Sequence, residues 1–231
     1  MGIRGKEHIR FFAKKKHLDI FEHPKPASKC LPMYFHKIKP QIGLSPQNST
    51  VKRCVPFIDA MTSGYIISMW CDVYVRAENE NLQIQFPDNI PLDKTLEQHS
   101  IEQFKGHPYS DDKLAKTPLK WVSPWGVETR KGWSCLFTSP LNHLEKRFKI
   151  MDGVVDTDTY YNQVHFPFVW TGGEGEFLIK QGTPLVQVIP FKRGSTQYSV
   201  VEQNEERVDV VQGQLGTLLR NAYRSLFWHK R

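Results

Sequence analysis

The chain has 231 residues, of which 39% are hydrophobic and 12% aromatic, which is enough for one large domain with a packed core and excludes a disordered composition. The 31 Lys and Arg residues outnumber the 24 Asp and Glu residues and leave a formal charge of +7, which favours an anionic partner. No apolar run approaches the roughly 18 residues that a membrane-spanning helix needs, so we expect no membrane partner.

The four cysteines do not have the spacing of a metal site. Cys30, Cys54, Cys71 and Cys135 form no CxxC pair, and no His pair accompanies them at the spacing of zinc ligands. We therefore expect no bound metal and four reduced thiols, as in a reducing cytoplasm. Phosphate loops of the GxGxxG and GxxxxGKS/T types are absent, so we also expect no resident cofactor.

Residues 1–17 are basic, with six Lys or Arg residues against one Glu. One interpretation is a basic arm that binds nucleic acid or an acidic neighbour. The other, which we favour, is an ordinary edge strand through Phe11 and Phe12, followed by solvated Lys14–Lys16.

A Pro-rich stretch follows, with six prolines between residues 24 and 56 that exclude one long helix. We interpret residues 1–54 as a basic N-terminal arm that lies extended over a sheet or a partner. Its aromatic side chains and lysines have the composition of a base-stacking surface, but aromatic side chains more often cover apolar surface.

The β-rich core is predicted over residues 55–200. Residues 65–75 alternate as one strand, and a polar turn leads back into residues 82–86 to complete a hairpin. Three tryptophans between residues 121 and 133 predict a packed sheet face. Residues 87–118 are polar and predict a surface insertion.

The most informative stretch is Gly153–Arg193, which predicts two strands around a turn and then a third strand. Asp156 and Asp158 stand at i and i+2, so both carboxylates should point to the same face of a strand. Such carboxylates need a partner, either in chemistry or in structure.

Residues 201–231 predict a C-terminal amphipathic helix. Its apolar residues recur at helical spacing and define one stripe. They are Val208, Val211, Leu215, Leu218, Leu219, Ala222, Tyr223 and Leu226. This stripe has to cover either the chain's own sheet or another subunit, and the pattern does not choose between them.

The order GVVDTD, then KQGTPLVQVI about thirty residues later, resembles the dUTPase/dCTP deaminase superfamily. The upstream segment KGWSCLFTSPLN falls where that family has the strand and loop before its Arg-Ser-Gly-Leu motif. The resemblance covers about residues 120–192. It implies an all-β fold with a dUTPase-like β-clip sheet core, here carrying the Pro-rich arm and the C-terminal helix. It also implies a symmetric homo-oligomer.

The same resemblance implies site residues. Asp156 takes the position of the catalytic, water-activating Asp, and Ser139 and Gln187 match residues that contact phosphate. Asp158 and Tyr160 are further nucleotide-binding candidates, and Mg²⁺ is implied if the chain is an enzyme.

Three departures from the family pattern argue against catalysis. Thr138 and Pro140 replace the Arg and Gly that flank the motif Ser, which removes a charged phosphate clamp and a backbone N–H. Thr159 intervenes before Tyr160, which should send the ring to the opposite face. The family's Gly-rich C-terminal arm is absent as well. We therefore favour a structural role for the two aspartates, which would cap a turn or satisfy buried N–H groups.

The whole chain also resembles a group of proteins common in tailed phages, especially marine ones, a likeness that supplies no chemistry. Our leading hypothesis is a non-catalytic structural or assembly protein of the virion, found in the host cytoplasm and the particle, with copies of itself and other phage proteins as partners. The alternative is a nucleotide-acting enzyme of the dUTPase or dCTP deaminase type. A weaker alternative is an accessory protein that binds nucleic acid through its basic termini.

Overall fold

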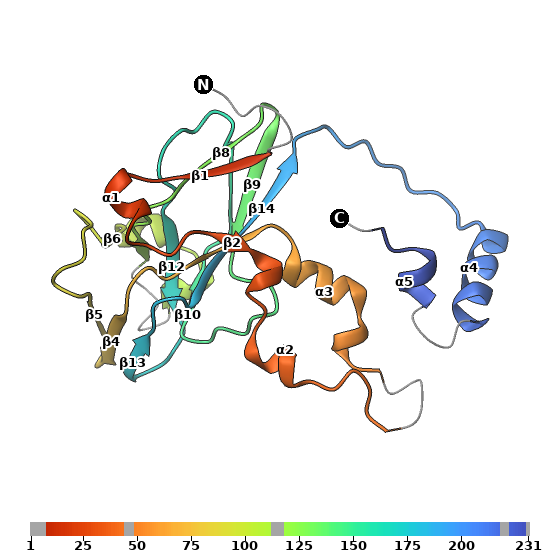
Figure 1. Cartoon of the computed structure of the whole chain (residues 1–231), viewed down its shortest axis with the longest axis horizontal. Helices are drawn as coiled ribbons and strands as arrows, with labels where there is room; N and C mark the ends of the chain where they lie inside the picture. Colours follow the sequence, from red (N-terminus) through yellow and green to blue (C-terminus); the bar gives the residue numbers. More distant parts are fainter. Residues whose placement is uncertain (1–7, 44–48, 112–117, 218–221, 230–231) are drawn as a thin grey trace.

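The computed structural model describes residues 8–43, 49–111, 118–217 and 222–229. The described chain is mostly β-structure, with antiparallel pairing between all neighbouring strands. Short helices lie at the periphery, and the sheets share one core (Figure 1).

A five-stranded sheet in the order β11-β9-β14-β3-β2 forms the centre. Its strands are β2 (Lys25–Pro26), β3 (Tyr65–Ser68), β9 (Trp133–Thr138), β11 (Gly153–Val155) and β14 (Pro184–Lys192). The nine-residue β14 is the longest of them and pairs with β9 on one side and β3 on the other. Leu185, Val186 and Val188 are fully buried, which explains the continuous apolar run in this strand.

Three smaller sheets surround the centre. The four-stranded sheet has the order β10-β12-β7-β6, the three-stranded sheet β13-β4-β5, and a further pair is β1-β8. Their strands are β1 (Ile9–Phe12), β4 (Val73–Glu78), β5 (Asn81–Gln85), β6 (Leu96–Gln98), β7 (Leu119–Trp121), β8 (Gly126–Thr129), β10 (Phe148–Ile150), β12 (Phe166–Trp170) and β13 (Gly175–Ile179).

The helical segments are short. They are α1 (Lys15–Leu18), α2 (Met33–Lys37), α3 (Val55–Thr62), α4 (Glu205–Thr217) and α5 (Ala222–Leu226), together with 3₁₀ turns at Ala27–Lys29, Val51–Arg53, Ile101–Phe104 and Pro108–Asp111. Among the described residues no helix is both long and apolar enough to cross a bilayer.

Aromatic side chains from several strands fill the core. Trp121 and Phe168 are fully buried and stack with their ring centroids 4.2 Å apart and their planes 5° apart. Trp125 is buried as well. The predicted packing on a sheet face is thus confirmed for Trp121. Trp125 is buried in the segment between β7 and β8, and Trp133, in β9, is half-buried.

The prediction of one continuous strand over residues 65–75 is wrong, because the stretch forms two strands. The chain leaves the central sheet after Ser68 and enters the three-stranded sheet at Val73, so β3 and β4 belong to different sheets. Met69 causes the break, because its N–H donates to Thr183 O (2.8 Å) and its carbonyl accepts from Gly182 N (2.8 Å). The hairpin that follows is confirmed, with β4 and β5 paired from Tyr74–Gln85 to Glu78–Asn81.

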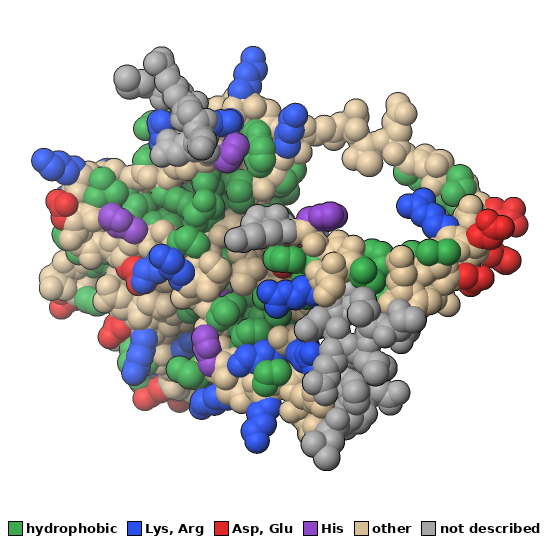
Figure 2. Space-filling model, turned by 45° about the vertical axis from the view of Figure 1, so that its right-hand side comes forward, with side chains coloured by type: hydrophobic (Ala, Val, Ile, Leu, Met, Phe, Trp, Pro, Cys, Tyr) green, Lys and Arg blue, Asp and Glu red, His purple; other side chains and the backbone are tan. Residues whose placement is uncertain are grey.

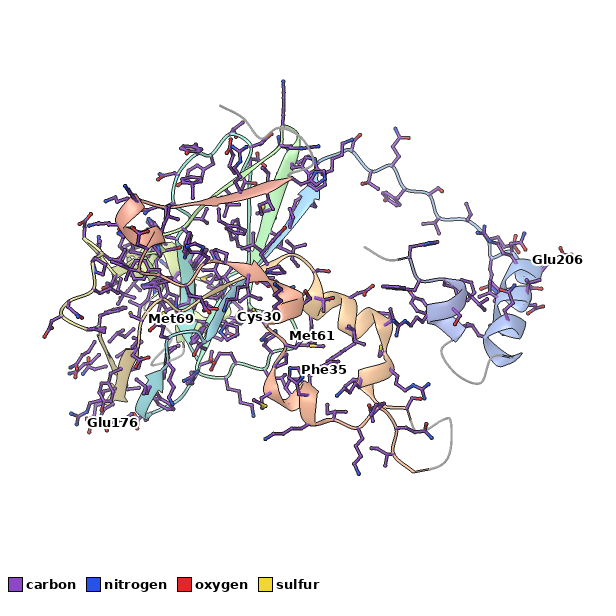
Figure 3. The ribbon with its side chains drawn as sticks, in the orientation of Figure 1. Cys30, Phe35, Met61, Met69, Glu176 and Glu206 are labelled. Carbon is purple, nitrogen blue, oxygen red and sulfur yellow. The ribbon has the colours of Figure 1, made fainter. Side chains whose placement is uncertain are left out.

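The N-terminal edge strand is confirmed over Ile9–Phe12, which pairs with β8, whereas residues 1–7 lie outside the described residues. The prediction of an extended arm is wrong for the Pro-rich stretch, which folds into short helical turns that pack beside α3. The buried side chains of Phe35 and Met61 lie in the region between α2 and α3 (Figure 3).

The C-terminal stretch is helical over α4 and α5, and residues 218–221 lie outside the described residues. Both helices stand apart from the sheets at the end of an extended segment, residues 194–204 (Figure 1). The chain then returns, because Trp228 Nε1 donates to Asp59 Oδ2 of α3 at 2.9 Å.

Candidate functional site

The two aspartates lie on a turn. Strand β11 ends at Val155, and the carbonyl of Asp156 accepts hydrogen bonds from the N–H groups of Thr159 (3.1 Å) and Tyr160 (2.9 Å). The prediction that both aspartates belong to a strand is therefore wrong. Both carboxylates nevertheless face the same group, because the turn brings them to the guanidinium of Arg193.

Asp158 is fully engaged by the chain itself. Its carboxylate accepts from both terminal nitrogens of Arg193, at 2.8 Å and 2.6 Å, and from the backbone N–H of Gly132 at 2.7 Å. Its side chain is only 2% exposed. A bidentate guanidinium–carboxylate pair with an additional backbone donor is a strong structural arrangement. Both carboxylate oxygens are thus engaged, and the side chain is almost inaccessible to a ligand.

The electrostatics of the turn follow from these contacts. The hydrogen bonds from Arg193, and then the one from the Gly132 N–H, lower the pKa of Asp158 to about 2. The same partnership raises the pKa of Arg193 above its usual range. The pair is therefore ionised at neutral pH and ties the end of β14 to the turn after β11.

Asp156 is more accessible. Its Oδ1 accepts from Ser134 Oγ at 2.7 Å and lies 3.1 Å from Arg193 Nη1, but its side chain remains 61% exposed. A carboxylate of this kind can in principle accept a proton from a water molecule. The adjacent guanidinium of Arg193 already provides this carboxylate with a counter-charge.

Arg193 is the site residue that sequence reasoning missed. It closes the stretch that begins at Gly153, and no motif singles it out. The available signal was chemical: two neighbouring carboxylates in an apolar setting require a cation. Arg193 also donates to Trp133 O at 3.0 Å, and its own N–H donates to Gly132 O at 2.8 Å.

Ser139 and Gln187 serve the fold. Ser139 Oγ accepts from Ile150 N at 3.0 Å. Gln187 is 0% exposed; its carbonyl oxygen accepts from Leu141 N (2.8 Å) and its amide donates to Ala60 O (2.9 Å) and Ser63 O (2.7 Å). Through these three bonds the Gln187 side chain links β14 to main-chain groups of two other segments, the loop after β9 and α3 with the residue that follows it.

The predicted site residues do not converge within one chain. Asp156 bonds Ser134 near the start of β9, whereas Ser139 follows the end of that strand and Gln187 pairs with Thr138. At about 3.3 Å per residue, the two ends of this stretch lie roughly 16 Å apart. The structure thus brings Asp156 and Asp158 together and keeps both phosphate candidates away from them.

Tyr160 does not form a stacking platform with another ring of the described chain. Its side chain is 46% exposed, and its hydroxyl accepts a long hydrogen bond from Asn162 Nδ2 at 3.5 Å. The next residue, Tyr161, instead stacks on Phe12 of β1, with centroids 4.2 Å apart. This contact holds the turn against the N-terminal strand.

The donor set at the turn does not fit a divalent cation. Among the described residues there is no group of three His, Cys, Asp or Glu side chains that could hold a metal ion. The guanidinium of Arg193 lies beside both carboxylates and occupies Asp158. The positive charge that Mg²⁺ would supply is already provided there by the protein.

Comparisons with known proteins find a weak likeness to dUTPases. The native EIAV dUTPase aligns with a TM-score of 0.33 and 8% identity over 62% of this chain and 85% of that chain. A Staphylococcus bacteriophage 80alpha dUTPase aligns with a TM-score of 0.34 and 13% identity over 62% and 78%. Scores at this level carry no argument about this chain. No protein-family model and no curated protein matches it.

The Asp158–Arg193 pair predicts a specific pH dependence of stability. Because the pKa of Asp158 falls from about 3.9 when unfolded to about 2 when folded, the pair stabilises the fold fully above about pH 4. This stabilisation should be lost as the pH falls toward 2. Urea unfolding followed by circular dichroism measures the free energy of unfolding at each pH. The difference in this free energy between the wild type and Asp158→Asn should become smaller as the pH falls from about 4 to about 2.

The control for this experiment is Asp156→Asn, which changes an exposed carboxylate on the same turn. At neutral pH it should lower the free energy of unfolding by less than Asp158→Asn does. If the free energy of unfolding of Asp158→Asn differs from that of the wild type by the same amount down to pH 2, the assigned role of the pair is contradicted.

Proposed function

We propose that this chain is a non-catalytic structural or assembly protein that associates with copies of itself and is built on a dUTPase-like sheet core. The observation that carries the proposal is the segment 194–204, which follows β14. Every residue of it is exposed, and Tyr198, Val200 and Val201 are 91%, 91% and 79% exposed. An extended segment that offers large apolar side chains to water gains free energy by packing against a partner.

The helices that follow support the same conclusion. In α4, Val210 and Leu215 are 61% and 40% exposed, and in α5, Tyr223 and Leu226 are 46% and 43% exposed. Figure 2 shows an opening between the extended segment and the body of the protein, so the arm does not cover the sheets beside it. Of the two alternatives left open by the helical pattern, a second subunit is favoured.

The turn with the aspartates supports a non-catalytic role. The residues aligned with phosphate ligands are used by the fold: Ser139 binds Ile150 N, and Gln187 binds three main-chain groups. Pro140 has no N–H to donate to a phosphate oxygen. Nothing in this set can neutralise the charge of a triphosphate as a guanidinium clamp does.

The biological setting of the proposal is a tailed-phage particle. It rests on the resemblance of the whole chain to proteins of such phages and on the dUTPase-like order of its motifs. The partners would be copies of this chain and other phage proteins, in the host cytoplasm during assembly and then in the virion. Self-association and incorporation are separate claims, and each has its own experiment.

The first prediction is that the purified chain is an oligomer held by its C-terminal arm. Replacing Tyr198, Val200 and Val201 with Ser should weaken association about tenfold or more, since tenfold corresponds to only about 1.4 kcal/mol of lost apolar packing. Size-exclusion chromatography with light scattering, over a range of concentrations, measures this. The matched control replaces the exposed polar residues Thr196, Gln197 and Gln203 with Ser and should leave association unchanged.

A wild-type chain that stays monomeric at high concentration would contradict self-association. Equal effects of the apolar and the polar triple variants would contradict the role of the arm, because both change the same exposed segment.

The second prediction concerns the particle. Quantitative mass spectrometry of purified virions from a phage that encodes this chain should find it in multiple copies per particle. Its ratio to the major capsid protein should stay constant through successive purification steps. Absence of the chain from virions, or its loss in a density gradient, would contradict the particle setting and leave self-association to be judged separately.

The alternative function is a nucleotide-acting enzyme of the dUTPase or dCTP deaminase type. One observation favours it: Asp156, aligned with the water-activating Asp, remains 61% exposed beside a hydrogen-bond donor, Ser134. Such a site would have to recruit its phosphate ligands from another copy, because those of the same chain lie at the far end of β9.

We expect the purified oligomer to release neither pyrophosphate from dUTP or dCTP nor ammonia from dCTP in the presence of Mg²⁺. The physical reason is the missing charge that would stabilise the transferred phosphoryl group. Turnover that disappears in Asp156→Asn and persists in Asp152→Asn, a nearby exposed aspartate, would overturn this expectation and establish the enzyme.

A further inference from the structure

Residues 25–54 contain six Lys or Arg residues and no Asp or Glu. We call its described part, residues 25–43 and 49–54, the basic lobe. It comprises β2, α2 and two 3₁₀ turns, and it packs beside α3. A run of thirty residues without one carboxylate is unusual in a chain that has 24 of them. It concentrates positive charge on one part of the molecule.

The lobe is folded into one surface. Residues on either side of the undescribed 44–48 come together, because Gln41 and Ser49 form a bridge and Thr50 N donates to Pro40 O at 3.1 Å. Lys52 Nζ donates to His36 O at 3.1 Å. Lys37 and Lys39 are therefore held beside Lys52, although the sequence separates them.

The lysines of this surface are available to a ligand. Lys29, Lys37 and Lys39 are exposed, and the described part of the chain offers them no carboxylate partner. Lys146, from the loop after β9, is exposed as well, and it lines a cavity together with Cys30–Met33 of the lobe. Figure 2 shows Lys and Arg side chains grouped in the lower middle of the molecule.

Carboxylates near the lobe are already engaged. Glu22 forms an ion pair with Lys25, and Glu145 pairs with Arg147 at 2.7 Å. Asp59 of α3 accepts from the Trp228 indole at 2.9 Å. The two glutamates are therefore charge-compensated, whereas the neutral indole leaves the charge of Asp59 in place. The six cations of residues 25–54 still outnumber these three acids.

The N-terminal cations are in a different state. Arg10 lies 3.6 Å from Glu128, and Lys14 lies 3.0 Å from Asp93. The described part of the basic N-terminus is thus partly neutralised by the body of the protein. The predicted basic termini at residues 1–7 and 230–231 lie outside the described residues. The lobe is the better anion-binding surface among the residues described.

The aromatic side chains of the lobe help to decide which kind of anionic partner it suits: single-stranded nucleic acid, duplex nucleic acid or protein. Phe35 is buried, stacks on Phe57 at 6.5 Å and lies 5.6 Å below Lys52 Nζ. Tyr34 donates its hydroxyl to Asn142 O. These rings hold the lobe together and are not free to stack on bases, which single-stranded nucleic acid binding uses. Protein interfaces, in turn, are depleted of Lys and enriched in accessible aromatic anchors.

We propose that the basic lobe binds the phosphate backbone of duplex nucleic acid without sequence preference. Lysine ammonium groups spread over a surface suit a regular row of phosphates, and no base contact is required. This inference is independent of self-association, although an assembled oligomer would repeat the lobe and strengthen binding through several contacts.

The test is fluorescence anisotropy with labelled random-sequence duplex DNA at several salt concentrations. The wild type should bind with an affinity that falls linearly with salt on logarithmic axes. The variant Lys29→Gln, Lys37→Gln, Lys39→Gln should bind roughly tenfold more weakly at low salt, and its salt slope should be shallower by about 0.9 for each phosphate contact removed.

Two further variants separate this surface from net charge and from folding. Lys131→Gln, Lys149→Gln, Lys180→Gln removes the same three charges from exposed positions outside the lobe and should bind nearly as the wild type does. Replacing the three lobe lysines with Arg keeps the charge and should keep binding. Circular dichroism confirms that each variant is folded.

Several outcomes would overturn the proposal. Equal losses in the lobe variant and the outside variant would show that only net charge matters. Tighter binding to single-stranded DNA than to the duplex would point to base stacking. Tighter binding to polyglutamate than to DNA would make the partner an acidic protein.

One further outcome would support the proposal. Duplex RNA that competes as well as duplex DNA would support backbone recognition, because no base edge is read.

Discussion

The structure depends on strand β14, which must satisfy a buried amide in its middle and present a cation at its end. Gln187 joins β14 to α3 and to the loop after β9 through three main-chain hydrogen bonds, with no exposure to water. Leaving these buried groups unpaired would cost about 1–3 kcal/mol each. Arg193 lies eight residues after the buried Leu185, just beyond the end of β14. Its guanidinium pairs with the carboxylates of Asp156 and Asp158.

The side chains that the sequence marks as site candidates are used mainly by the fold. Both oxygens of the Asp158 carboxylate accept hydrogen bonds from Arg193 or Gly132, and the hydroxyl of Ser139 accepts one from Ile150. Ser139 and Gln187 direct their hydrogen-bonding groups to the main chain. Of the two aspartates, Asp156 has the accessible carboxylate. Its substitution therefore tests whether the turn serves the fold or a reaction.

The two proposed surfaces lie on different parts of the chain and use different physics. The C-terminal arm offers apolar side chains, whose burial is driven by removal of area from water and does not depend strongly on salt. The basic lobe offers ammonium groups, whose binding to phosphate depends steeply on salt. A protein with both can assemble through one surface and hold a duplex along the other, and the two activities respond to different variants.

The sequence alone determined the β-rich class and the hairpin of β4 and β5, because period-two alternation is a local property. The edge strand through Phe11 and Phe12 was the favoured of two interpretations, and of the three clustered tryptophans Trp121 and Trp125 are buried. The tertiary structure decided what depends on distant partners. It divided residues 65–75 between two sheets through the bonds of Met69, and it placed Asp158 on Arg193, 35 residues away. It also separated Asp156 from Ser139 and Gln187. Spacing along a chain gives the face of a side chain, but only packing gives its partner.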